Sequence, residues 1–145
     1  MRILVFTSLF PSQLCPNHGL FVYQRVAHWA RRPGNHVQVV APVPYFPAWR
    51  RWTRWYPFSQ IPKREQIGNL TVYHPRYLLL PKVAMPLHGL LMFLGSWPRV
   101  WRLKKKTHFD WIDAHYVYPD GFAAVLLGKL LRIPVMLTAR GTDIN

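Results

Sequence analysis

The 145-residue sequence has few acidic residues and only one cysteine. Five Asp and Glu residues stand against 19 Lys and Arg residues, so the formal net charge is +14. Cys15 has no second thiol in the chain, which excludes an internal disulfide framework and a zinc site built on several thiolates. We therefore expect a reducing compartment, the cytoplasm. The excess of positive charge predicts anionic partners, namely phosphate-bearing substrates, nucleic acid or an anionic membrane surface.

Long hydrophobic runs are also lacking. No window contains 18 uninterrupted apolar residues, and the nearest one, 83–100, is broken by His88, Ser96, Pro98 and Arg99. The sequence therefore predicts no transmembrane helix. The apolar run that begins at Ile3 is too short for a signal peptide and is followed by polar residues and proline, so we interpret it as a first strand.

Strand-like and helix-like segments alternate along the chain. This alternation predicts a Rossmann-like α/β domain spanning 1–145, with an open, mostly parallel sheet of about five strands and helices on both faces. The expected strands are 3–7, 36–41, 111–114 and 134–138, and the expected helices are 19–32, 87–106 and 121–131. A short hairpin is expected over 66–77, and Pro98 is expected to kink or split its helix. Residues 42–62, with five prolines, predict a long irregular loop.

The loop after the first expected strand lacks the glycines of a dinucleotide-binding fingerprint. A G-x-G-x-x-G motif would let the backbone approach a pyrophosphate, but this loop has one glycine, Gly19. A nicotinamide or flavin enzyme is therefore disfavoured, and we expect no cofactor. Gly19 opens a helix whose free N–H groups could bind an anion. A glycine that serves only the turn fits the pattern equally well.

Two later loops carry further candidate residues. His115 lies just past the carboxyl end of an expected strand, where open α/β sheets bind ligands, although a lone histidine is more often structural. Asp120 is expected to cap the next helix. Arg140 could grip a phosphate or carboxylate with two nitrogens, or pair locally with Asp143.

Residues 49–58 are unusually rich in tryptophan and arginine. Tryptophan favours the membrane interface and arginine is attracted to anionic lipid, so the segment and the helix 87–106 predict membrane contact. Solvated arginines on a loop folded over the sheet are the alternative. The same composition could bind single-stranded nucleic acid, but no recognisable nucleic-acid motif is present. A non-catalytic basic membrane- or nucleic-acid-binding protein is thus the rival function. The membrane-contact candidates are Trp49, Arg50, Arg51, Trp52, Arg54 and Trp55.

Five segments, in order, resemble the amino-terminal domain of family 4 glycosyltransferases, which have the GT-B fold. The segments are 1–22 with Pro16-Asn17-His18-Gly19, Val39 to Pro42, His74 to Tyr77, Asp113 to Gly121, and Thr138 to Asn145. The resemblance implies transfer of a sugar, with retention of configuration, from a nucleotide-sugar donor to a polysaccharide or lipid-linked acceptor. It implies no obligatory metal. It further implies a role in assembling cell-surface polysaccharide or lipopolysaccharide.

The resemblance also implies roles for single residues. His115 would face the transferred sugar, Gly19 would border the donor phosphates, and Arg140 and Asp143 would lie at the floor of the cleft between two domains. Relatives often have histidine where this chain has Asp113. The carboxyl-terminal domain that grips the nucleotide is expected to be absent from these 145 residues, so we expect negligible transferase activity from them alone.

Overall fold

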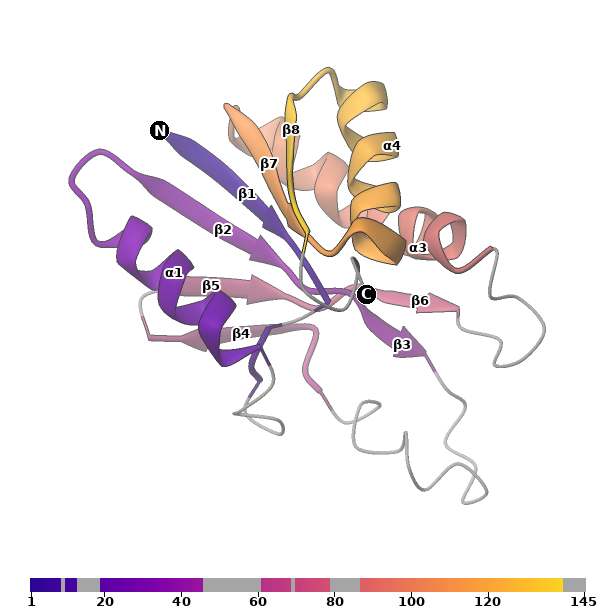
Figure 1. Ribbon diagram of the computed structural model, residues 1–145, viewed down its shortest axis with the longest axis horizontal. Coiled ribbons are helices and arrows are strands. Elements are labelled where there is room, and N and C mark those ends of the chain that lie inside the picture. Colours follow the sequence, from indigo (N-terminus) through magenta and orange to yellow (C-terminus); the bar gives the residue numbers. More distant parts are fainter. Residues whose placement is uncertain (9, 13–18, 46–60, 69, 79–86, 140–145) are drawn as a thin grey trace.

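The computed structural model describes residues 1–8, 10–12, 19–45, 61–68, 70–78 and 87–139. Six strands form one sheet in the order β4-β5-β2-β1-β7-β8 (Figure 1). All neighbouring pairs are parallel except β4 with β5. The predicted mostly parallel α/β fold is confirmed, with six strands in place of about five. The strands are β1 (Arg2–Phe6), β2 (His36–Val40), β4 (Arg64–Ile67), β5 (Leu70–Tyr73), β7 (Trp111–His115) and β8 (Val135–Thr138).

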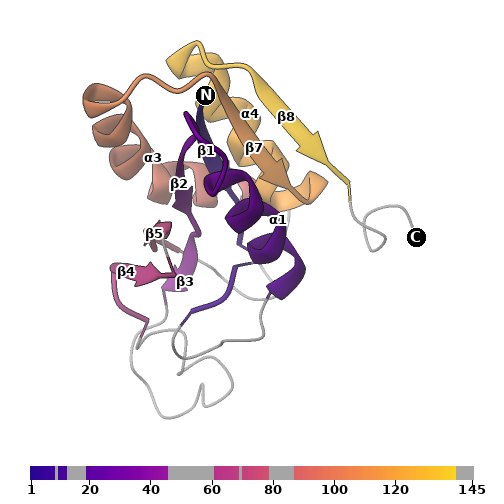
Figure 2. The same ribbon diagram turned by 90° about the vertical axis from the view of Figure 1, so that its left-hand side faces the viewer.

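Helices cover both faces of this sheet, as predicted (Figure 2). The helix α1 (Leu20–Ala30) lies on one face, and α3 (His88–Lys106) and α4 (Phe122–Leu131) lie on the other. Side chains alternate between the faces along each strand. In β1, Ile3 and Val5 therefore join the core under α1, whereas Leu4 and Phe6 join the core under α3 and α4.

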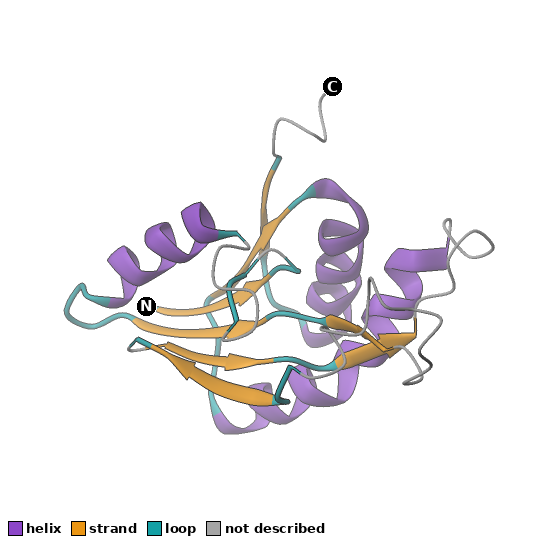
Figure 3. Ribbon diagram, turned by 90° about the horizontal axis from the view of Figure 1, so that it is seen from below, coloured by secondary structure: helices purple, strands orange, loops and turns teal. Residues whose placement is uncertain are grey.

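A two-stranded parallel ladder extends the fold beyond the carboxyl ends of β2 and β5 (Figures 1 and 3). It pairs β3 (Val43–Tyr45) with β6 (Arg76–Leu78). The sequence predicted irregular structure from residue 42, and this was wrong for β3, because the strand is defined by a partner more than 30 residues away. The predicted hairpin is confirmed as β4 and β5, with Gly68 at φ 60° in the turn.

Pro98 was predicted to kink or split its helix; α3 is continuous through Pro98, so the split is wrong, while the kink stays a prediction. An internal proline costs about 3 kcal/mol in a helix, and burial of apolar side chains on both sides of it offsets that cost. Met92, Phe93, Val100 and Leu103 all belong to the core. Among the described residues, no helix combines the length and apolar character needed to cross a bilayer.

Gly95 brings α3 close to β6. A Cβ atom at this position would lie 2.5 Å from the carbonyl oxygen of Arg76 and 2.6 Å from the Cβ of Tyr77. Such separations are far inside normal contact, so only glycine fits without a backbone shift. The strand β6 thereby lies against the middle of α3.

Candidate functional site

The carboxyl ends of five parallel strands meet at one edge of the main sheet. Thr7 follows β1, His74 follows β5, and His115 and Thr138 end β7 and β8. Ligands of open α/β sheets bind at this edge. The predicted position of His115 at the edge is therefore confirmed, while its predicted role in the reaction is not tested by position.

His115 forms a buried pair with Asp113. Its Nε2 lies 3.1 Å from Oδ2 of Asp113, and both side chains are 0% exposed. The two residues are separated by one position on β7, so they share a face of the sheet. This is the face covered by α1, because Ile112 and Ala114, which alternate with them, belong to the core under α3 and α4. A carboxylate that accepts a hydrogen bond from an imidazole fixes the orientation of the ring and the site of its proton.

The Asp113 carboxylate has one oxygen left over. Its Oδ1 is buried and has no hydrogen-bond partner among the described residues. An unsatisfied buried acceptor costs about 1–3 kcal/mol. This acceptor is not recognisable from the sequence, in which Asp113 is only a departure from histidine.

The residue after His115 has a strained backbone. Tyr116 has φ 78° and ψ 135°, a conformation that non-glycine residues rarely adopt. Strain of this kind costs about 1–3 kcal/mol and is concentrated at functional sites. The amide of Tyr116 donates to the carbonyl of Thr138 at 3.1 Å, which ties the start of this loop to the end of β8. The Tyr118–Pro119 peptide in the same loop is cis.

Asp120 joins this loop to the loop after β1. Its carboxylate accepts hydrogen bonds from the Ser8 amide at 2.7 Å, the Ser8 hydroxyl at 3.0 Å and the Thr7 hydroxyl at 3.3 Å. The prediction that Asp120 caps the next helix was wrong. Gly121 occupies the cap position of α4, and no side chain caps the helix. Partners 112 residues away determine the role of Asp120, so local sequence could not show it.

Tyr77 and His88 form a second polar pair beside Asp120. The Tyr77 hydroxyl lies 3.1 Å from Nε2 of His88, and the two rings stack 5.4 Å apart. Burial, helped by the negative charge of Asp120, raises the pKa of Tyr77 well above its ordinary value. Burial lowers the pKa of His88. The pair is therefore neutral near pH 7. No role for Tyr77 could be predicted from the sequence, in which it is only part of the segment from His74 to Tyr77.

Gly19 begins α1 in a left-handed conformation, with φ 66° and ψ 32°. Glycine adopts this conformation without steric cost, and the Gly19 carbonyl accepts the amides of Val22 and Tyr23 at 3.0 and 3.1 Å. The turn therefore requires glycine. The first turn of α1 carries no acidic side chain, so its positive end is not neutralised from within the helix.

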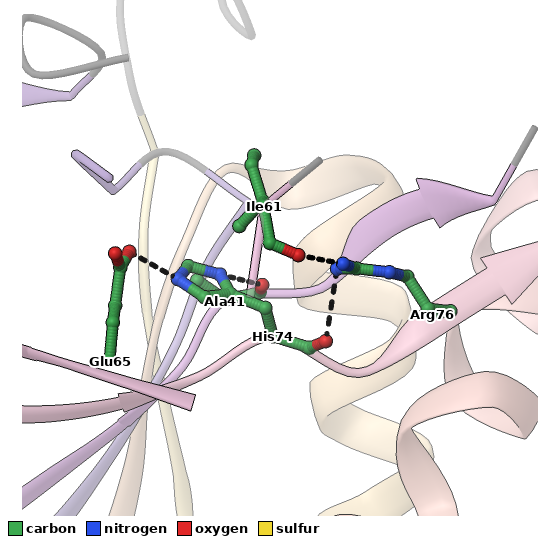
Figure 4. A network of polar contacts seen from close by, with 5 residues as sticks. All are labelled: Ala41, Ile61, Glu65, His74 and Arg76. Atoms are coloured by element: carbon green, nitrogen blue, oxygen red, sulfur yellow. Dashed lines mark hydrogen bonds and ion pairs between the residues drawn. The ribbon is translucent and has the colours of Figure 1, made fainter. Parts of the chain in front are cut away.

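His74 lies at the same edge in a separate buried network (Figure 4). Its Nδ1 lies 3.0 Å from the carbonyl of Ala41, and its Nε2 lies 2.6 Å from Oε1 of Glu65. A carbonyl oxygen can only accept, so Nδ1 is the donor of that hydrogen bond. The network links the ends of β2 and β5 to β4.

Several predicted residues lie outside the described part of the chain. They are Arg140, Asp143 and the six membrane-contact candidates Trp49, Arg50, Arg51, Trp52, Arg54 and Trp55. Within the described part, no group of three His, Cys, Asp or Glu side chains could hold a metal ion. A cavity of about 390 Å³ is lined by residues that include Arg2, His36 and Lys106. It lies at the amino ends of the strands, away from the edge where His115 lies.

Comparison with known proteins gives one informative relative. No family model matches the chain. The chain is 29% identical over 153 aligned residues to the Bacillus subtilis (strain 168) protein described as "Putative teichuronic acid biosynthesis glycosyltransferase TuaC". The match covers 100% of this chain and 37% of the relative, so the chain spans little more than a third of that protein's length. The chain is thus a distant homologue of a protein described as a glycosyltransferase.

Proposed function

We propose that this chain forms the acceptor-side domain of a retaining family 4 glycosyltransferase with the GT-B fold. The observation that carries the proposal is the buried Asp113–His115 pair at the carboxyl edge of a mostly parallel sheet. The distant glycosyltransferase homologue supports the reaction class. In this proposal a sugar passes from a nucleotide-sugar donor to a polysaccharide or lipid-linked acceptor during assembly of the cell envelope.

His115 is the proposed catalytic residue, in contact with the transferred sugar. Asp113 positions its ring through the contact between Oδ2 and Nε2. The remaining proposed substrate-binding residues are Gly19, through the amino end of α1, and Arg140 and Asp143. The complete reaction also needs groups that bind the nucleotide, and we assign those to a part of the enzyme beyond these 145 residues.

The name of the relative suggests the acceptor. Teichuronic acid is an acidic product, and a chain with 19 basic and 5 acidic residues attracts acidic saccharides over long distances. We therefore propose an anionic saccharide of the cell envelope as the acceptor class.

Titration of the ¹³C-labelled chain with teichuronic acid oligosaccharides tests this function. We expect the ring resonances of His115 to shift, and those of His36 to stay unchanged, because His36 begins β2 at the opposite edge of the sheet. Neutral dextran oligosaccharides of equal length serve as the control ligand. Equal shifts at both histidines, or no shift at His115, would contradict the proposed site.

A stripe on α3 favours contact with a membrane as part of this function. Leu90, Leu94 and Trp101 are exposed at helical spacing, and Leu87 is exposed just before the helix. The Lys105 ammonium lies 3.6 Å from the centre of the Trp101 ring. Exposed apolar side chains beside a basic helix end are typical of helices that lie in an anionic membrane interface. We propose that this stripe, with the residues from Trp49 to Trp55, rests on the cytoplasmic face of the membrane.

A further inference from the structure

A small basic pocket lies between α3 and the segment that joins β5 to β6. The cavity has a volume of about 130 Å³. Four of its lining residues are basic, and His74 and Gly95 also line it. The four basic residues are Lys63, Arg76, Arg99 and Arg102.

The fold places these side chains from three separate elements. Arg99 and Arg102 are three residues apart on α3, so they lie on one face of the helix, which Gly95 also shares. The close approach at Gly95 brings that face against the backbone of Arg76. Lys63 lies just before β4, whose partner β5 leads into the pocket.

Two of the arginines are held in place by neighbouring groups. The Arg76 guanidinium donates to the carbonyls of His74, at 3.2 Å, and of Ile61 (Figure 4). The Arg99 guanidinium lies over the ring of Tyr73, 5.0 Å from its centre. Both side chains are therefore ordered before any ligand arrives, which reduces the entropy lost on binding.

The pocket has no negative charge of its own. None of its lining residues is acidic, and none of the four basic side chains forms an ion pair with any described residue. None of the four described carboxylates pairs with a basic side chain of the pocket: Glu65 contacts His74, Asp110 the Arg2 amide, Asp113 His115 and Asp120 Ser8. Burial lowers the pKa of Arg76, which reflects a cation partly removed from water without a compensating anion.

We propose that this pocket binds a phosphate or diphosphate group. Guanidinium groups bind phosphate oxygens through paired hydrogen bonds, and converging cations favour a ligand with more than one negative charge over a carboxylate. The inference rests on the proposed function in one respect: we expect the bound phosphate group to be carried by the saccharide acceptor. That group could belong to a soluble phosphosaccharide or to the head of a lipid, and both present the same oxygens.

Calorimetric titration of the 145-residue chain with inorganic pyrophosphate, at constant ionic strength, tests the pocket. Lys63→Gln and Arg102→Gln each remove one charge from an exposed side chain without a hydrogen-bonded partner among the described residues, so the fold should persist. We expect each to weaken binding about tenfold, which is about 1.4 kcal/mol. Arg31→Gln is the matched control, because it removes an exposed charge next to α1 on the opposite face of the sheet, and it should change binding less than about twofold.

Vesicles distinguish the two sources of the group. If pyrophosphate displaces the chain from phosphatidylcholine vesicles containing phosphatidic acid, and Arg102→Gln weakens both interactions, the pocket accepts lipid head groups. If pyrophosphate binds in the pocket without displacing the chain, the ligand is soluble. Equal affinities of the wild type, Arg102→Gln and Arg31→Gln for pyrophosphate would overturn the proposed phosphate site. Such a result would indicate only a general attraction of pyrophosphate to the basic surface. Neither result bears on His115, so the proposed transfer reaction stands or fails separately.

Discussion

Removal of the Asp120 carboxylate should destabilise the chain strongly. Asp120→Ala deletes the acceptor for the Ser8 amide and hydroxyl and for the Thr7 hydroxyl. Hydrogen bonds to a charged group contribute about 1.5–3 kcal/mol each, but Ser8 is only partly buried, so water can replace part of the loss. We expect a loss of about 3–5 kcal/mol, a large share of the roughly 5–15 kcal/mol that stabilises an ordinary domain.

Urea denaturation followed by circular dichroism measures this loss. Asp110→Ala is the matched control, because Asp110 also accepts a backbone amide, from Arg2 at 2.8 Å, but at an exposed site. Its cost should stay below about 1 kcal/mol. Ser8→Ala should cost about 1–2 kcal/mol, and the double variant should cost less than the sum. A loss within about 1 kcal/mol for Asp120→Ala, or strict additivity with Ser8→Ala, would refute the role assigned to this carboxylate.

Three further outcomes are expected. Gly95→Ala gains about 1 kcal/mol of helix propensity, but its methyl group over-packs against the Arg76 carbonyl. We therefore expect urea denaturation to show a net loss of about 1–2 kcal/mol in the free energy of unfolding. Leu94→Ala, at an exposed position, is the control, and unchanged stability of Gly95→Ala would contradict the close approach. The free energy of unfolding should fall as the pH rises above about 10, because Tyr77 ionises there in the unfolded chain while its raised pKa keeps it neutral in the folded chain. Tyr77→Phe should reduce that fall. An identical pH profile for the variant would contradict the raised pKa of Tyr77. Lys105→Gln should weaken the affinity for phosphatidylglycerol vesicles, measured by sedimentation, about fivefold, as expected for about 1 kcal/mol per basic residue. Lys129→Gln on α4 should leave this affinity unchanged. Equal effects of the two variants would argue against membrane contact through the α3 stripe.

The elements could be predicted where local sequence determines them. The apolar runs that became β1 and β2 and the glycine turn between β4 and β5 are local signals, and each was predicted correctly. The strand β3 was missed because its three residues, one of them proline, are ordered by pairing with β6. Pro98 did not split α3, because core packing on both sides of it outweighs the local penalty.

The candidate site was predictable only in its position. His115 could be placed at the carboxyl edge because the parallel order of the strands followed from the alternating pattern. Its partner Asp113 lies two residues before it, but in the sequence alone this residue is only a departure from the family pattern. The contacts of Asp120 and Tyr77 depend on residues brought together from β1, β6 and α3, and single-sequence patterns carry no information on such pairs.

Sugar transfer by a chimeric enzyme tests most directly the central claim, that this chain is the acceptor-side domain of a glycosyltransferase. Residues 1–145 would replace the matching part of the Bacillus subtilis relative, and transfer from radiolabelled nucleotide sugars to teichuronic acid oligosaccharides would be measured. We predict transfer by the chimera, none by the 145-residue chain, and a fall in kcat of at least about 100-fold, or 2.7 kcal/mol, for the folded His115→Ala chimera. A folded chimera without transfer, or full kcat in His115→Ala, would contradict the account.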